Sequence, residues 1–141
     1  MRRAFRGCRN MVIHATDRPD LSRVTDGTLM FQDCSLLNQD ISDWDVSHFT
    51  QMGGMFRGAK RFNQDISSWD VSHVYNMQNM FYRSPLSTLN YDSILNGWAM
   101  LSLRSNVTLG ANQTHYSEEG RASRQYLIDN FGWNIVDAGE I

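Results

Sequence analysis

The segment from Asn38 to Phe56 is repeated with few changes from Asn63 to Phe81, at an offset of 25 residues. Of the 19 aligned positions, 13 are identical, including the run Trp-Asp-Val-Ser-His. A fixed period between about 20 and 50 residues is typical of solenoids, in which each repeat buries its apolar side only by stacking on the next. The repeat therefore predicts a solenoid.

Each repeat has two halves. The stretch from Phe62 to Val71 is rich in Ser, Asp and Asn around a few apolar residues, which predicts a short strand and then a turn. The apolar residues between Ser72 and Phe81 recur at helical spacing, which predicts a short amphipathic helix with Ser72 as its N-cap. Ser22 and Ser47 take the same place in earlier repeats. The fold class expected is an α/β repeat, a short, right-handed, leucine-rich-repeat-like solenoid.

The repeat frame divides the chain into two parts. Residues 1–86 are predicted to form solenoid coils, with a partial coil at 1–11 and complete coils at 12–37, 38–62 and 63–86. Residues 87–141 lack the period and are predicted to form an α+β cap. Its expected elements are a helix at 89–101, a strand at 106–109, a helix from N-cap Ser117 to Gly132, and a strand at 133–136.

The partial first coil is predicted to leave an open edge. We therefore expect either that the chain is a fragment of a longer solenoid or that it forms a homodimer through the N-terminal coil. Cys8 and Cys34 fall at equivalent points of consecutive coils. They are expected to form a buried ladder of thiols, with a disulfide as the alternative, since stacked coils bring Cα atoms to about 5 Å.

Polar residues at matched positions favour structural roles. Asn38 and Asn63, with the Gln and Asp that follow each, are expected to form ladders between coils or to hold the loop backbone. The alternative is a calcium site formed by Asp40, Asp45, Asp65 and Asp70, but the sequence around them lacks the glycine-containing acidic loop of known calcium sites. Trp44 and Trp69 are expected in the core. We therefore expect neither a metal nor a cofactor.

Composition and motifs exclude several function classes. The net charge is −2, no basic stripe indicates nucleic acid binding, and no apolar run approaches a membrane span. No metalloprotease, nucleophile-elbow or phosphate-loop motif occurs, so no enzymatic activity is expected. The Ser47–His48 and Ser72–His73 pairs are interpreted as caps rather than nucleophile–base pairs.

A non-catalytic protein-binding module is the function expected. Its binding surface should lie where the repeats differ, because the shared positions are needed for stacking. Candidate binding residues with side chains suited to protein recognition are Arg57, Tyr75, Gln78, Asn79 and Tyr82. The alternative for Tyr75 and Tyr82 is that they cover the seam with the cap. The alternative functions are self-assembly through the open N-terminal end, and carbohydrate binding, which would need Trp98 or Trp133 exposed.

The segment Phe62-Asn-Gln-Asp-Ile-Ser-Ser-Trp-Asp-Val-Ser-His-Val-Tyr-Asn-Met-Gln-Asn-Met-Phe-Tyr82 resembles the repeat of the BspA-like family of leucine-rich-repeat surface proteins. The segment Ala15–Ser22 is similar to a variant coil of that family, and the tail from Asn90 resembles its closing segment. The resemblance implies a bacterial surface or secreted protein that binds another protein, in some members a host matrix protein. No signal peptide precedes the first coil, so a cytoplasmic location is the alternative.

Overall fold

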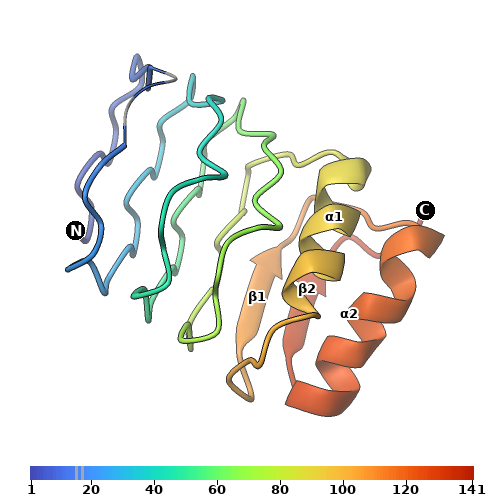
Figure 1. The fold of residues 1–141 in the computed structure, drawn as a ribbon. Coiled ribbons are helices and arrows are strands. Elements are labelled where there is room, and N and C mark those ends of the chain that lie inside the picture. Colours follow the sequence, from blue (N-terminus) through green and yellow to red (C-terminus); the bar gives the residue numbers. More distant parts are fainter. Residues whose placement is uncertain (15, 17) are drawn as a thin grey trace.

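The computed structural model describes residues 1–14, 16 and 18–141. The described residues before Thr88 form successive windings without helices or strands, and these windings stack side by side (Figure 1). Two helices and two strands follow at one end of the stack, and the N-terminus lies at the other end. The segment Ala15–Ser22, which resembles a variant coil, includes Ala15 and Asp17, and these two residues lie outside the described part.

Each winding contains a segment folded as a chain of turns, which we call a ribbon. Within a ribbon, every second N–H group donates to the carbonyl three residues before it, as Arg57 does to Gly54 at 3.0 Å. The N–H groups between them donate to the next ribbon, as Phe56 does to Met80 at 3.0 Å. The ribbons are residues 1–8, 27–34, 52–59 and 77–84.

The helix predicted within each repeat is wrong. In the described residues, segment 72–81 contains turns and isolated bridges, and the first helix of the chain begins only at Thr88. An α-helix needs every N–H group for its own backbone, whereas half of those in a ribbon bond the neighbouring winding. Alternating left-handed residues such as Asn79 and Arg83, each with a φ of 57°, also prevent a helix.

The strand predicted within each repeat is also wrong. Residues 62–71 carry no strand. In the described residues, strand-type pairing between windings is limited to single parallel bridges, Asp26 with Gln51 and Gln51 with Asn76. Because no helix follows, the N-cap role predicted for Ser22, Ser47 and Ser72 is wrong as well. Ser47 instead bonds the carboxylate of Asp45 through its backbone N–H at 3.0 Å and its hydroxyl at 2.6 Å.

Matched apolar residues stack along the core. The rings of Phe5, Phe31, Phe56 and Phe81 form one column, with centroids 5.5 to 5.8 Å apart and planes within 8° of parallel. Trp69 is 1% exposed and Trp44 is 7% exposed, so the prediction that both lie in the core is confirmed. The column shows that the sequence period is also the spatial period of the stack.

A second column of asparagines ties the backbone of neighbouring windings together. The Asn38 side-chain oxygen accepts the N–H of Asn63 at 2.7 Å. The Asn63 side-chain oxygen accepts the N–H of Ser87 at 2.8 Å. Of the two predicted roles for these asparagines, the structure therefore shows the one in which the side chain holds loop backbone.

The C-terminal segment contains α1 (Thr88–Trp98), β1 (Thr108–Ala111), α2 (Glu118–Phe131) and β2 (Asn134–Asp137). β1 pairs in parallel with β2, and it also accepts N–H groups of the last ribbon, including that of Phe81 at Gly110. Ser117 accepts the N–H of Glu119, and Gly132 ends α2 with a φ of 65°, so both predicted caps are confirmed.

A buried ion pair joins the parts of this segment. Asp137 on β2 accepts hydrogen bonds from Arg124 on α2 at 2.8 Å and from the Tyr91 hydroxyl on α1 at 3.0 Å. The Asp137 side chain is only 2% exposed. Within the described residues, neither helix has the length and apolar composition needed to cross a bilayer.

Candidate functional site

Two of the predicted binding residues lie together on the ribbon face. The guanidinium carbon of Arg57 lies 5.3 Å from the centre of the Tyr82 ring, and that of Arg83 lies at the same distance. Both are within the range of a cation–π interaction. Within the described part of the chain, neither arginine has a carboxylate partner. We call Arg57, Tyr82 and Arg83 the arginine–tyrosine cluster.

The ribbon geometry places this cluster. Arg57 and Tyr82 occupy the same position in consecutive ribbons, because the Gly58 N–H donates to the Tyr82 carbonyl at 2.9 Å. Both arginines are exposed, while Tyr82 is half-buried. The cluster thus presents two cationic groups, held against an aromatic ring, to solvent.

The other predicted binding residues lie near the cluster in sequence but make no ring contact with it. Tyr75 is 52% exposed, and its N–H donates to Thr50 at 2.9 Å. The Gln78 side chain is exposed, and its N–H donates to Asn76 at 3.0 Å. Asn79 adopts a left-handed backbone beside Gly110 of β1. Tyr75 and Gln78 are thus accessible, and Asn79 has a structural role at the seam with β1.

Arg83 belongs to the cluster but is not among the binding residues predicted from the sequence. It occupies the left-handed position that Gly58 takes in the preceding ribbon, so the two repeats differ there as they do at the other candidates. The signal in the sequence is the difference between Gly58 and Arg83, which lie 25 residues apart at matched positions of the repeat.

The aspartates considered for calcium are engaged with backbone. Asp40, Asp45, Asp65 and Asp70 each accept the N–H of the serine two residues later, at 2.9 to 3.0 Å. Among the described residues, no group of three or more His, Cys, Asp or Glu lies close enough to hold a metal ion. Hydrogen bonds from the hydroxyl and backbone of Ser47 hold the pKa of Asp45 below its ordinary value.

The repeated Ser–His pairs place each hydroxyl next to an imidazole. The distance from Oγ to Nδ1 is 3.3 Å both for Ser47 with His48 and for Ser72 with His73. Ser47 Oγ also lies 2.6 Å from the Asp45 carboxylate, to which it donates. Because the Ser47 hydroxyl donates its hydrogen bond to the carboxylate, it does not donate to His48 as an activated nucleophile would. The arrangement is that of a turn.

Both cysteines are free thiols, so the structure contains the predicted thiols but not the alternative disulfide. Cys34 is buried, and its Sγ lies 2.9 Å from the Phe5 carbonyl. Burial raises the pKa of the Cys34 thiol to about 11. Cys8 is exposed, which departs from the prediction that both are buried, because the first winding has no neighbour over its outer side in the structure.

Trp98 and Trp133, which a carbohydrate site would need at the surface, are 0% and 3% exposed. Their indole N–H groups donate to the Ile66 carbonyl at 3.3 Å and the Arg104 carbonyl at 2.9 Å. Each therefore has a place in the packing of the C-terminal segment. Neither ring is available to stack on a sugar.

Comparison with known proteins identifies a family. No curated protein and no solved structure matches the chain significantly. The family described as "Mycoplasma protein of unknown function, DUF285" matches residues 1–118, which include all four ribbons, α1 and β1. Because the match spans most of the sequence, the chain belongs to the DUF285 family.

Proposed function

We propose that the chain is a non-catalytic protein-binding module that uses the arginine–tyrosine cluster to recognise an acidic surface on its partner. The observation that carries this proposal is the pair of exposed arginines whose guanidinium groups lie against the Tyr82 ring, without carboxylate partners among the described residues. Arginine and tyrosine are the side chains that most often dominate protein interfaces. Guanidinium groups bind carboxylates through paired hydrogen bonds.

The architecture supports the same proposal. We infer that the stacked windings are a short, right-handed solenoid of the leucine-rich-repeat-like kind, related to the BspA-like surface proteins. Inter-winding hydrogen bonds at a constant register support this inference. In a solenoid, positions that differ between repeats form an extended surface without disturbing the stacking. An extracellular or cell-surface location, with a host or cell-surface protein as partner, follows from the resemblance.

Binding to purified extracellular-matrix proteins would test the proposed function. The wild-type chain is immobilised, and each matrix protein is titrated over it with surface plasmon resonance. We expect saturable binding to at least one of them, weakened about tenfold or more by Arg57→Ala with Tyr82→Ala. Binding should also fall as salt rises, because arginine–carboxylate attraction is screened.

Arg23→Ala is the matched control, because Arg23 is exposed but lies outside the ribbons. Its affinity should equal that of the wild type. Equal affinity of the wild type and the Arg57/Tyr82 double variant, with both folded by circular dichroism, would remove the cluster from the binding surface. Absence of binding to every matrix protein would remove the adhesion role.

A further inference from the structure

All backbone hydrogen bonds between ribbons run in one direction. Each of the first three ribbons donates N–H groups to carbonyls of the ribbon that follows it in sequence. Phe5 donates to Met30 at 2.9 Å, Phe31 to Met55 at 2.9 Å, and Phe56 to Met80 at 3.0 Å. Among ribbons 1–8, 27–34, 52–59 and 77–84, no backbone N–H group of a later ribbon donates to a carbonyl of an earlier one. The stack is therefore polar, with acceptors on one edge.

The acceptor edge is the outer side of ribbon 1–8. The carbonyls of Arg2, Ala4 and Arg6 occupy the positions at which Thr28, Met30 and Gln32 accept bonds from the preceding ribbon. In the described residues, these three carbonyls accept no hydrogen bond. Two such edges cannot pair with each other, because acceptor would face acceptor. This polarity opposes a symmetric homodimer held by backbone bonds between two N-terminal coils.

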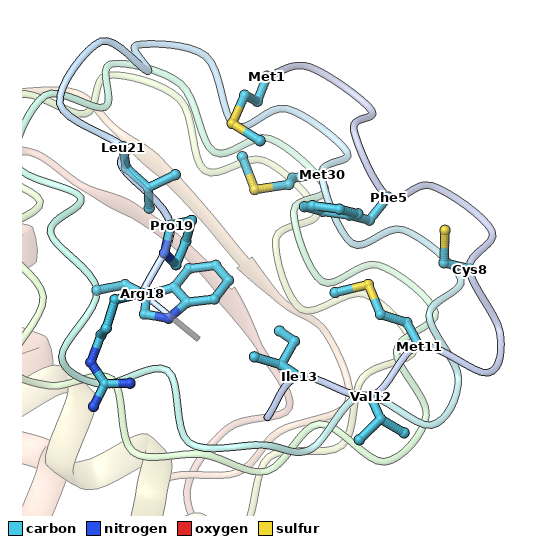
Figure 2. Close-up of a pocket in the computed structure, with 11 residues that line it drawn as sticks. Met1, Phe5, Cys8, Met11, Val12, Ile13, Arg18, Pro19, Leu21 and Met30 are labelled. Carbon is cyan, nitrogen blue, oxygen red and sulfur yellow. The ribbon is translucent and has the colours of Figure 1, made fainter. Parts of the chain in front are cut away.

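A pocket of about 600 Å³ opens beside the acceptor edge. Figure 2 shows the side chains of Phe5, Met11, Ile13 and Met30 around it. Its origin lies in the repeat: Pro19 stands where the next two windings have Trp44 and Trp69. The segment between ribbons 1–8 and 27–34 therefore lacks the indole that the later windings have, and an apolar hollow is left.

Trp44 contributes an unused donor to this pocket. In the following winding, the Trp69 indole N–H donates to the Ile41 carbonyl at 3.0 Å. The Trp44 side chain lines the pocket, and its buried Nε1 has no hydrogen-bond partner within the described part of the chain. Buried donors are rarely left unpaired in native proteins, so this group marks a place for an acceptor.

The charges around the edge specify the occupant further. Arg2, Arg3, Arg6 and Arg9 are all exposed on or next to ribbon 1–8. Segment 24–37, which contains the ribbon 27–34 that packs against the inner side of ribbon 1–8, carries Asp26 and Asp33 and no basic residue. Burial opposes a lowered pKa of Asp26, but hydrogen bonds from Thr28 outweigh it, and the charge of Arg2 lowers that pKa further. An acidic ribbon thus complements the basic one.

We propose that the outer edge of ribbon 1–8 is a docking site for an acidic ribbon segment of a different protein that carries this repeat, rather than for a second copy of this chain. The segment donates alternate backbone N–H groups to the carbonyls of Arg2, Ala4 and Arg6. Its phenylalanine continues the column on Phe5, and its apolar side chains enter the pocket. The three ribbon contacts already present in the chain are the template for this fourth one.

A synthetic peptide of residues 24–37, with Cys34→Ser, is the probe. We expect the fluorescently labelled peptide to bind the whole chain saturably and to change the tryptophan fluorescence through Trp44. N-methylation of Phe31 removes an N–H that donates between ribbons. This modification should weaken binding about tenfold, because the complex loses one hydrogen bond and one carbonyl of the chain is buried without a partner.

Two matched peptides distinguish ribbon docking from nonspecific hydrophobic binding. N-methylation of Ser35, whose N–H makes no hydrogen bond to any described residue, should leave binding unchanged. The peptide of residues 49–62 has the same ribbon pattern but carries Arg57, Lys60 and Arg61. It should bind less tightly at low salt, and the difference should shrink as salt rises.

Alkylation of Cys8, which lines the pocket, should block binding in the wild type but have no effect on binding to a Cys8→Ser chain.

Three outcomes would overturn the proposal. They are no binding at millimolar peptide, equal weakening by the two N-methylated peptides, and self-association of the chain that blocks Cys8 and excludes the peptide. The last outcome would make a second copy the occupant. The arginine–tyrosine cluster is not part of this site, so Arg57→Ala should not affect peptide binding.

Discussion

Phe56 packs face to face on Phe81, with ring centroids 5.8 Å apart and planes 5° from parallel, although 25 residues separate them in sequence. Phe31 lies on the opposite face of Phe56 at 5.7 Å. The same residues are joined through their backbones, because the Phe56 N–H donates to Met80. Side-chain stacking and backbone bonding therefore fix the register of the windings together.

Phe56→Ala should destabilise the chain by about 3–5 kcal/mol, because the side chain is fully buried and contacts rings on both faces. Chemical denaturation followed by far-UV circular dichroism measures the change. Tyr75→Ala is the control, since Tyr75 is half exposed and makes no ring contact, and it should cost far less. Similar losses for the two variants would contradict the stacked column.

Asn63→Ala should lower the free energy of unfolding by about 1–3 kcal/mol, because the N–H of Ser87 and the side chain of Asn90 lose their acceptor. Asn63→Asp keeps an oxygen at the same place and should lose less. Thermal unfolding of the three proteins ranks them. If Asp were as harmful as Ala, the lost stability would not come from the acceptor role of Asn63.

Stability should fall in acid through the aspartates of the turns. Hydrogen bonds from the hydroxyl and backbone of Ser22 and Ser47 lower the pKa values of Asp20 and Asp45 below the ordinary 3.8. A carboxylate with a lowered folded-state pKa stabilises the fold above its unfolded pKa, and this contribution is lost as pH falls through the folded pKa.

The Asp20→Asn, Asp45→Asn double variant tests the pH effect, because Asn keeps an acceptor for the turn but does not titrate. Urea unfolding between pH 6 and pH 3 should show a smaller loss of stability for the variant than for the wild type. Parallel curves for the two proteins would show that these carboxylates do not contribute to the acid sensitivity.

The two thiols should differ sharply in reactivity. Burial raises the pKa of the Cys34 thiol to about 11, so Cys34 stays protonated and does not form the reactive thiolate. Cys8, in contrast, is exposed to reagents. Labelling with a thiol reagent at mildly alkaline pH should modify Cys8 in the native protein and Cys34 only after unfolding. The Cys8→Ser variant should then show no fast phase. A fast phase in that variant would mean that the first winding does not cover Cys34.

The sequence predicts the period of the windings but not their backbone. Matched residues such as Phe56 and Phe81 could be paired from sequence identity alone. The caps Ser117 and Gly132 could be predicted because their signals are local. The ribbon could not be predicted, because the apolar spacing at 74, 77, 80 and 81 fits a helix as well as a chain of turns. The choice depends on where each N–H group finds its acceptor, and that acceptor lies in the next winding.

The candidate site shows the same limit. Arg57 and Tyr82 could be selected because they differ between aligned repeats, and the structure brings them together. The αL position of Arg83 depends on the alternating backbone of the ribbon, and the sequence has glycine there only in some windings. The pocket beside Phe5 likewise arises from Pro19 in place of a tryptophan, a difference whose consequence appears only when the windings are stacked.

Couplings across hydrogen bonds, measured by NMR between amide nitrogens and carbonyl carbons, test the stacked ribbons most directly. The account predicts couplings from the Phe31 amide to the Met55 carbonyl and from the Phe56 amide to the Met80 carbonyl, with Arg57 coupled to Gly54. Coupling of the Phe56 amide to the Met52 carbonyl, four residues before it, would show a helix instead and would contradict the ribbon and the stack built from it.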